Sequence, residues 1–289
     1  MTRVVVAVSV LAIASYSDWR TREASDLNWL FLGSVGLILI IYQLVTTNVP
    51  YGYYLFLIPL GVVFFDIFWD RRGLFEEGIN LPPLILYIAS ALALVYLFLE
   101  FGEEELFWQL LVVLVMFVVI MLLYQFNIIK GGADAKALIA LSLVFPTYPQ
   151  IGEFPLIHVP YEQVMLIFPF SLLVLFNAAI LSLVVPLGLL VFNTAKKDVK
   201  IPAMLLGYKM GIAEARKKFV WPMERMEGGK TRFAYFPKDD EGSEAVLDGL
   251  ANAGLTRIWV TPKVPFLIFI TVALLISTFI GNIVLLVLS

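Results

Sequence analysis

Two short blocks of this sequence place an aspartate at the end of an apolar segment, where a carboxylate is costly unless it has a function. Asp134 lies in the block 131–136 (GGADAK), directly after the apolar run 107–126 and at the start of another. Asp18 lies in the block 15–22 (SYSDWRTR), at the end of the first apolar run. These two carboxylates are the candidate reactive groups.

Two carboxylates held within a few ångströms can divide acid and base roles between them. Like charges so close do not both ionise readily in a low-dielectric site, so the pair holds one shared proton near neutral pH. One carboxylate can then activate a water molecule while the other donates a proton. Gly131 and Gly132 allow positive φ and a close backbone approach, so an extended ligand strand could lie beside this turn. We therefore expect a binding cleft lined by Lys130, Gly131, Gly132 and Ala133.

The elements that must position these acids are membrane helices. Hydrophobic residues make up 61% of the 289 residues and charged residues 15%, with a mean hydropathy of +0.91, which excludes an ordinary soluble domain. A bilayer core about 30 Å thick is crossed by about 20 helical residues. The fold class predicted is an all-α polytopic membrane protein with about eight spans, near residues 3–18, 27–46, 52–69, 82–100, 107–126, 133–146, 163–193 and 264–288.

The basic residues orient these spans. If the loop that holds Arg20 and Arg22 is cytoplasmic, every Lys and Arg except Arg3 lies at or near the cytoplasmic side, as the positive-inside rule requires. The N-terminus is then external, and Asp18 and Asp134 lie at the same, cytoplasmic face. The external connections carry glutamates instead, namely Glu100, Glu103, Glu104, Glu105, Glu153 and Glu162.

The composition becomes charged and rich in Gly and Pro after the seventh span, which predicts three parts. Residues 1–194 form a transmembrane catalytic bundle, residues 195–263 a small cytoplasmic α+β domain, and residues 264–289 a C-terminal transmembrane helix. The basic side chains of the cytoplasmic domain face anionic lipid headgroups or orient a substrate, or the domain is only a solvated connector. Its predicted elements are helices over 201–219 and 244–253 and strands over 232–236 and 256–261.

The residue inventory excludes several chemistries. The chain has no cysteine, so disulfides, thiolate nucleophiles and cysteine-ligated zinc are not expected. Its one histidine, His158, falls in an external loop and is interpreted as an ordinary loop residue. We expect no metal and no cofactor, and no segment has a pattern typical of nucleic-acid binding.

Three further charged residues near the cytoplasmic face have structural interpretations. Asp26 precedes the second apolar run and is interpreted as a helix N-cap rather than a third catalytic group. Asp66 is interpreted as an ion-pair partner of Arg71 or Lys136, with a proton-handling role as the alternative. Lys136 is two residues past Asp134, so it faces away on a helix, and a snorkelling lysine is favoured over an accessory role.

The blocks 17–22 (SDWRTR) and 131–136, with Asp26, resemble the two signature motifs of the GxGD-type membrane aspartyl peptidases, specifically archaeal preflagellin (archaellin) and type IV prepilin peptidases. Ala133 stands where the motif has its second glycine, as archaeal members tolerate. Asp18 and Asp134 are 116 residues apart with four intervening helices, whereas family members usually have two. An added pair of crossings leaves both acids at one face. The cysteine-rich zinc loop of bacterial members is missing, which points to the archaeal branch.

The resemblance implies a metal-independent aspartic endopeptidase of the cell membrane with Asp18 and Asp134 as the catalytic pair. Such an enzyme removes the short basic leader, a class III signal peptide, from archaellin or type IV pilin-like precursors at the cytoplasmic membrane face, ahead of the hydrophobic segment. Its partners would be these precursors and membrane lipid. The motif also retains a lysine at the position of Lys136.

Three other classes of protein compete with this interpretation. A proton- or cation-coupled transporter would use Asp18, Asp66 and Asp134 as intramembrane sites, but it gives no reason for two acids at one face within peptidase-like motifs. A presenilin-like protease would carry Tyr-Asp and Pro-Ala-Leu signatures, which this sequence lacks. A structural protein of pilus assembly is the third alternative.

Overall fold

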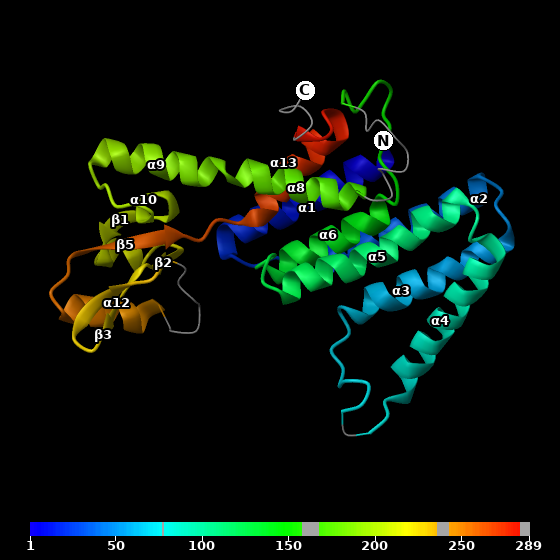
Figure 1. Cartoon of the computed structure of the whole chain (residues 1–289), viewed down its shortest axis with the longest axis horizontal. Coiled ribbons are helices and arrows are strands. Elements are labelled where there is room, and N and C mark those ends of the chain that lie inside the picture. The colour runs from blue at the N-terminus through cyan, green and yellow to red at the C-terminus, as the bar shows by residue number, and fades with distance from the viewer. Residues whose placement is uncertain (77, 158–167, 236–242, 284–289) are drawn as a thin grey trace. The chain divides into compact units, whose positions relative to one another are not determined.

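The computed structural model describes residues 1–289 except 77, 158–167, 236–242 and 284–289, and these residues are mostly helical (Figure 1). They form two compact units. One unit combines Met1–Ile180 with Pro265–Ser289, and the other is Leu181–Val264.

A helix lies within each of the eight predicted spans. By length and composition, α2, α4, α5 and the apolar stretch Phe170–Lys196 are long enough to cross a membrane. That last stretch is divided at Leu183 into two helices. The helices of the first unit are α1 (Thr2–Thr21), α2 (Asp26–Thr46), the short 3-10 helix η1 (Tyr51–Phe56), α3 (Leu57–Asp66), α4 (Leu81–Phe101), α5 (Glu105–Gln125), α6 (Gly132–Val144), α8 (Phe170–Ser182) and α13 (Phe266–Phe279).

Helix α6 is the buried centre of this unit. Every residue from Asp134 to Val144 except Lys136 is buried, and the helix contacts α1, α2, α5 and α13. Its closest approach is to α2, where a Cβ on Gly36 would lie 2.8 Å from the Cβ of Leu143. A small residue is therefore required on α2 for the two helices to pack, as is common between membrane helices.

Arg3, the one basic residue predicted to lie on the external side, has a structural explanation. Its guanidinium donates to the carbonyl of Val144 at the end of α6, to Leu39 O at 3.2 Å and to Gln43 Oε1 at 2.8 Å. The last carbonyls of a helix lack intrahelical partners, so an arginine there satisfies them and complements the helix dipole. Arg3 thus links the start of α1 to the C-terminal parts of α2 and α6 by hydrogen bonds.

The second unit is a small α+β structure. Its α12 (Ser243–Asn252) and β5 (Arg257–Pro262) confirm the helix predicted over 244–253 and the strand predicted over 256–261. Three antiparallel strands form a sheet in the order β1-β5-β2, and β3 and β4 form a separate hairpin. The other elements are α9 (Val184–Lys196), α10 (Ala203–Leu206), β1 (Tyr208–Gly211), α11 (Ile212–Ala215), β2 (Val220–Pro222), β3 (Glu224–Glu227) and β4 (Lys230–Phe233).

The helix predicted over 201–219 is wrong. That segment contains the short helices α10 and α11 with strand β1 between them. Gly207 is extended at the start of β1, and a Cβ there would lie 2.2 Å from the carbonyl oxygen of Val260 in β5. Pairing with a distant strand therefore decided the local structure against the helical pattern. The strand predicted over 232–236 is present up to Phe233, and Phe236 lies outside the described residues.

Candidate active site

Asp134 is the third residue of α6, and it is almost fully buried, with 9% of its surface exposed. The N-cap residue is Gly131, whose backbone is extended and which has no side chain to cap the helix. The free amides and the positive end of the helix dipole favour negative charge in a first turn. The position and the burial of Asp134 are more typical of a reactive carboxylate than of a solvent-exposed surface carboxylate.

Gly131 leaves the space that the Asp134 carboxylate occupies. A Cβ built on Gly131 would lie 2.1 Å from Asp134 Oδ2 and 2.9 Å from its Cγ, distances that no side chain tolerates. A Cβ on Gly132 would lie 3.4 Å from the hydroxyl of Tyr124, a much milder contact. The prediction that these glycines serve through positive φ is wrong for Gly131, whose φ is −90°. A glycine is needed at position 131 because a Cβ there would occupy the position of the Asp134 carboxylate.

Asp18 lies in the last turn of α1 and is partly buried. Its carboxylate is close enough to Asp134 for the two charges to interact, and it also interacts electrostatically with Arg22. The helix ends at Thr21, and its C-cap residue Arg22 has a left-handed φ of 62° and donates its amide to the Asp18 carbonyl at 2.9 Å. The structure therefore brings the two predicted aspartates together at one end of the helical unit.

Lys136 pairs with Asp26, which neither residue's sequence interpretation anticipated. Lys136 Nζ donates to both carboxylate oxygens of Asp26 at 2.7 Å and lies 5.2 Å from the ring centroid of Phe68. The N-cap of α2 is Ser25, whose hydroxyl accepts from the amide of Leu27, so the prediction of an Asp26 cap is wrong. Lys136, interpreted as a snorkelling lysine, is partly exposed and its charged end forms this ion pair. The pair joins the starts of α2 and α6, two residues from Asp134.

We expect this ion pair to position Asp134. Lys136→Met and Asp26→Asn should each lower kcat about tenfold with little change in KM, because a misplacement of about 1 Å in a reacting group is costly. The exchanged double variant, Asp26→Lys with Lys136→Asp, should recover part of that loss. Asp70→Asn, a carboxylate change outside the pair, is the control. A double variant no better than either single variant would contradict the positioning role.

Asp66 forms a structural cluster at the end of α3. Arg71 donates to it through Nε at 2.8 Å and Nη2 at 2.9 Å, and the Tyr87 hydroxyl donates to Oδ2 at 2.6 Å. The hydrogen bond to Asp66 raises the pKa of the Arg71 guanidinium above its usual value. The Arg71 partner matches one of the two expected, and Lys136 does not take part. These contacts favour structural pairing over proton handling.

The remaining predicted site residues surround the start of α6. Lys130 is exposed, and Gly131, Gly132 and Ala133 are partly exposed, so this turn is accessible beside the buried Asp134. In the described part of the chain, no group of three His, Cys, Asp or Glu side chains is arranged to hold a metal ion. His158 lies outside the described residues.

Sequence reasoning missed three side chains near this site. They are Asp26 as the partner of Lys136, Tyr87 as the donor to Asp66, and Tyr124 beside Gly132. The pairs Asp26–Lys136 and Asp66–Tyr87 each join two different helices. Tyr124 lies beside Gly132 because the chain turns between α5 and α6. No local pattern marks any of them. The only available signal was that Asp26 and Lys136 both belong to the residues that resemble the two peptidase motifs.

Comparisons with known proteins point to one family. Residues 199–283 match the family model described as Archaeal Peptidase A24 C-terminus Type II, a region that covers most of the second unit and α13. A preflagellin peptidase of Methanococcus voltae is 24% identical over 280 residues, covering 94% of this chain and 92% of the relative. A preflagellin peptidase of Methanococcus maripaludis is 22% identical over 294 residues, covering 98% and 96%.

A third relative, a preflagellin peptidase of Methanocaldococcus jannaschii, is 28% identical over 172 residues, which is 55% of this chain and 66% of the relative. The matches to the other two relatives span nearly the whole chain, while the family model matches the C-terminal region. The C-terminal region of the chain is thus similar to the archaeal A24 peptidases, and nearly its whole length is similar to preflagellin peptidases.

Proposed function

We propose that this A24 peptidase removes the short basic leader, a class III signal peptide, from archaellin or type IV pilin-like precursors. The observation that carries the proposal is the meeting of Asp18 and Asp134 at one end of the helical unit, each within a peptidase-like motif. The relatives named preflagellin peptidases support the substrate class. The transporter alternative loses support because Asp66 is fully engaged by Arg71 and Tyr87.

The proposed chemistry is direct hydrolysis by the aspartate pair. One carboxylate accepts a proton from a water molecule as the water oxygen attacks the scissile carbonyl carbon, and the other carboxyl donates its proton to the carbonyl oxygen. The carboxyl that took the proton from water then passes it to the amide nitrogen, and the C–N bond breaks. The other carboxylate takes a proton from a hydroxyl of the tetrahedral intermediate, so the pair again holds one shared proton. Asp134, buried at the start of α6, and Asp18, partly buried in α1, are the two groups proposed for these roles.

We further propose eight membrane spans with an external N-terminus, so that the aspartate pair lies at the cytoplasmic face. The division into a bundle of residues 1–194, a cytoplasmic domain of residues 195–263 and a last helix of residues 264–289 belongs to this proposal. The 13 residues of α6 cover about 20 Å, less than the thickness of a bilayer core. Asp134 at its start can therefore lie in a recess open to water.

The test is leader removal by the purified full chain. In detergent, it should convert an archaellin precursor to the mature form, with the new N-terminus identified by mass spectrometry. We expect the rate to be unchanged by EDTA and by N-ethylmaleimide, because the chain has no cysteine and one histidine. Loss of activity with a chelator that zinc restores would contradict the metal-independent mechanism, and no cleavage of any precursor would overturn the proposed function.

A further inference from the structure

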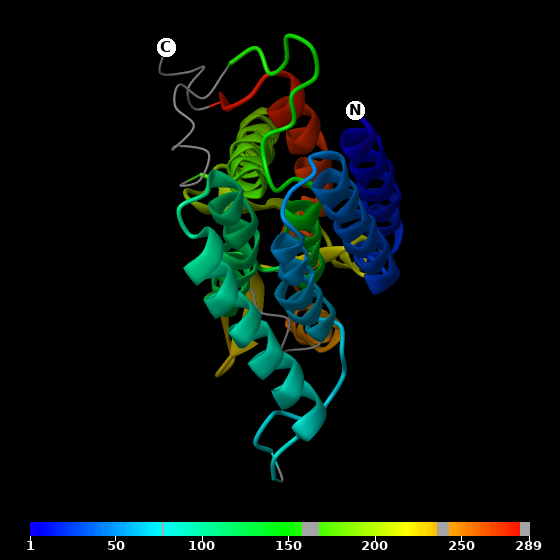
Figure 2. The same ribbon diagram turned by 90° about the vertical axis from the view of Figure 1, so that its right-hand side faces the viewer.

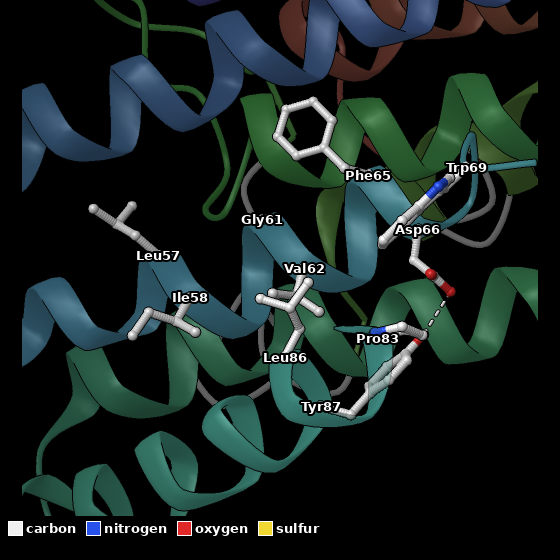
Figure 3. Close-up of a pocket in the computed structure, with 10 residues that line it drawn as sticks. All are labelled: Leu57, Ile58, Gly61, Val62, Phe65, Asp66, Trp69, Pro83, Leu86 and Tyr87. Atoms are coloured by element: carbon white, nitrogen blue, oxygen red, sulfur yellow. Dashed lines mark hydrogen bonds between the residues drawn. The ribbon is translucent and has the colours of Figure 1, made fainter. Parts of the chain in front are cut away.

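Helices α3 and α4 lie side by side (Figures 1 and 2). Residues of both helices line a pocket of about 360 Å³ (Figure 3). Most of its wall is apolar, with Ile58 and Val62 from α3 and Leu86 from α4. Ile58 and Leu86 are more than a third exposed, although they line the pocket. An apolar surface of this kind is suited to an apolar ligand within the membrane.

At Gly61 the wall of the pocket has no side chain. In the described part of the chain, no atom lies within 4 Å of a Cβ built there, whereas a Cβ on Gly33 of α2 would lie 2.0 Å from the ring of Phe64. Phe64 therefore fixes the far side of α3 against α2, while the near side offers a glycine to an incoming chain. Glycines on membrane helices allow another helix to approach closely.

One end of the pocket is polar but carries no unpaired carboxylate. Figure 3 shows Asp66 and Tyr87 joined by a hydrogen bond at this end, with Leu57 at the other. Arg71 neutralises Asp66 and lies 5.6 Å above the ring of Trp69, which also lines the pocket. Tryptophan and arginine are typical of the membrane–water boundary. The pocket thus changes from apolar to polar along its length.

The polar end is joined to the candidate active site. Phe68, the neighbour of Trp69, contacts Lys136, which is paired with Asp26 and lies two residues from Asp134. The start of α6, the start of α2 and the end of α3 therefore meet at one level of the helical unit. The polar end of the pocket is therefore the end that Phe68 and Lys136 link to the helix carrying Asp134.

We propose that the α3–α4 pocket receives the apolar helix that follows the scissile bond of the precursor. This inference rests on the proposed function. A precursor of that class changes from a charged leader to an apolar segment at the cleavage site, and the pocket changes polarity in the same order away from Asp134. The ten residues of α3 offer about 15 Å of wall, enough for nearly three turns of a bound helix.

The first test compares two substrates. One is the full precursor, and the other is a leader peptide that ends a few residues after the scissile bond and lacks the apolar segment. Gly61→Leu should raise KM for the full precursor about tenfold, as expected when a side chain overfills a packing surface, and leave KM for the short peptide unchanged. The matched control is Gly188→Leu in α9, because a Cβ on Gly188 also meets no described atom within 4 Å.

The second test does not depend on a bulky side chain. Because the chain has no cysteine, Val62→Cys introduces a single thiol, and it is combined with Asp134→Asn to keep the precursor uncleaved. Single cysteines are placed along the apolar segment of the precursor, and disulfides are formed with a mild oxidant. We expect crosslinks at every third or fourth precursor position, the period of one helical face, and none with Gly188→Cys.

The outcomes separate this inference from the proposed function. If the unaltered enzyme cleaves both substrates but Gly61→Leu affects neither and Val62→Cys gives no periodic crosslinks, the pocket holds membrane lipid and the inference is overturned. An equal loss on both substrates would also overturn it, since the effect would then act through the aspartate pair. If the unaltered enzyme cleaves neither substrate, the proposed function itself fails.

Discussion

Replacing either Asp18 or Asp134 with asparagine should lower the rate of precursor cleavage about a thousandfold or more. Each change removes one of the two groups that must hold and move the proton, while asparagine keeps the shape of the side chain. The measurement is kcat for leader removal by the purified full chain. Because the two carboxyls act as one unit, the double variant should be no slower than either single variant.

The control for the aspartate pair is Asp70→Asn, which removes an exposed carboxylate just past the end of α3 and should retain full activity. Thermal unfolding in detergent should show that the Asp18 and Asp134 variants remain folded. Substantial turnover by either variant would remove that residue from the catalytic pair. Asp26→Asn is expected to be intermediate, since Asp26 acts through Lys136 rather than on substrate.

Gly131→Ala should lower kcat about a hundredfold, the second largest effect expected. The added Cβ would lie 2.1 Å from Asp134 Oδ2, so the carboxylate must leave the position it holds at the start of α6. A displaced catalytic group loses about this much of its effect even when the residue itself is intact. The measurement is kcat and KM on the same precursor, with a thermal melt to show that α6 is still formed.

Gly132→Ala provides the matched comparison, because its Cβ would meet only the Tyr124 hydroxyl, at 3.4 Å. We expect a much smaller loss than for Gly131→Ala. Gly249→Ala in α12, where the nearest atom is 3.9 Å away, should have no effect. Equal losses at Gly131 and Gly132 would show that the loop needs backbone freedom rather than space for the carboxylate.

The family match and the candidate catalytic pair lie in different parts of the chain. The family model covers residues 199–283, which hold the sheet, α12 and α13, whereas Asp18 and Asp134 lie in the helical unit. The family match therefore does not by itself assign the aspartates. The proposed assignment rests on their motifs and on the proximity of the two carboxylates, and the variants described above test it.

The proposed binding of the precursor in the α3–α4 pocket would give a purpose to the additional helices between the two motif blocks. Two helices would suffice to return the chain to the face of Asp18, and four are present. An enzyme that cleaves beside an apolar segment must also accommodate that segment. A wall that is apolar along α3 and polar at Asp66 meets this need without adding a charged group to the membrane.

The sequence by itself determined the properties that follow from local pattern. Apolar runs of membrane length located the helices because hydropathy acts residue by residue. Four apolar runs separate Asp18 from Asp134, and an even number of crossings predicts that both acids lie at one face. In the structure the two carboxylates are close enough for their charges to interact. In the second unit, the amphipathic segment over 244–253 and the alternating segment over 256–261 formed α12 and β5 as predicted.

The tertiary structure decided every contact between distant segments. Lys136 and Asp26 are 110 residues apart, and Tyr87 is 21 residues from Asp66, so neither pair has a local sequence signal. The need for glycine at position 131 depends on where the Asp134 side chain folds, which a motif does not state. Residues 201–219 formed a strand and two short helices because pairing with β5 outweighed helical periodicity. Side-chain partners and steric limits are properties of packing, and packing exists only once the helices and strands are assembled.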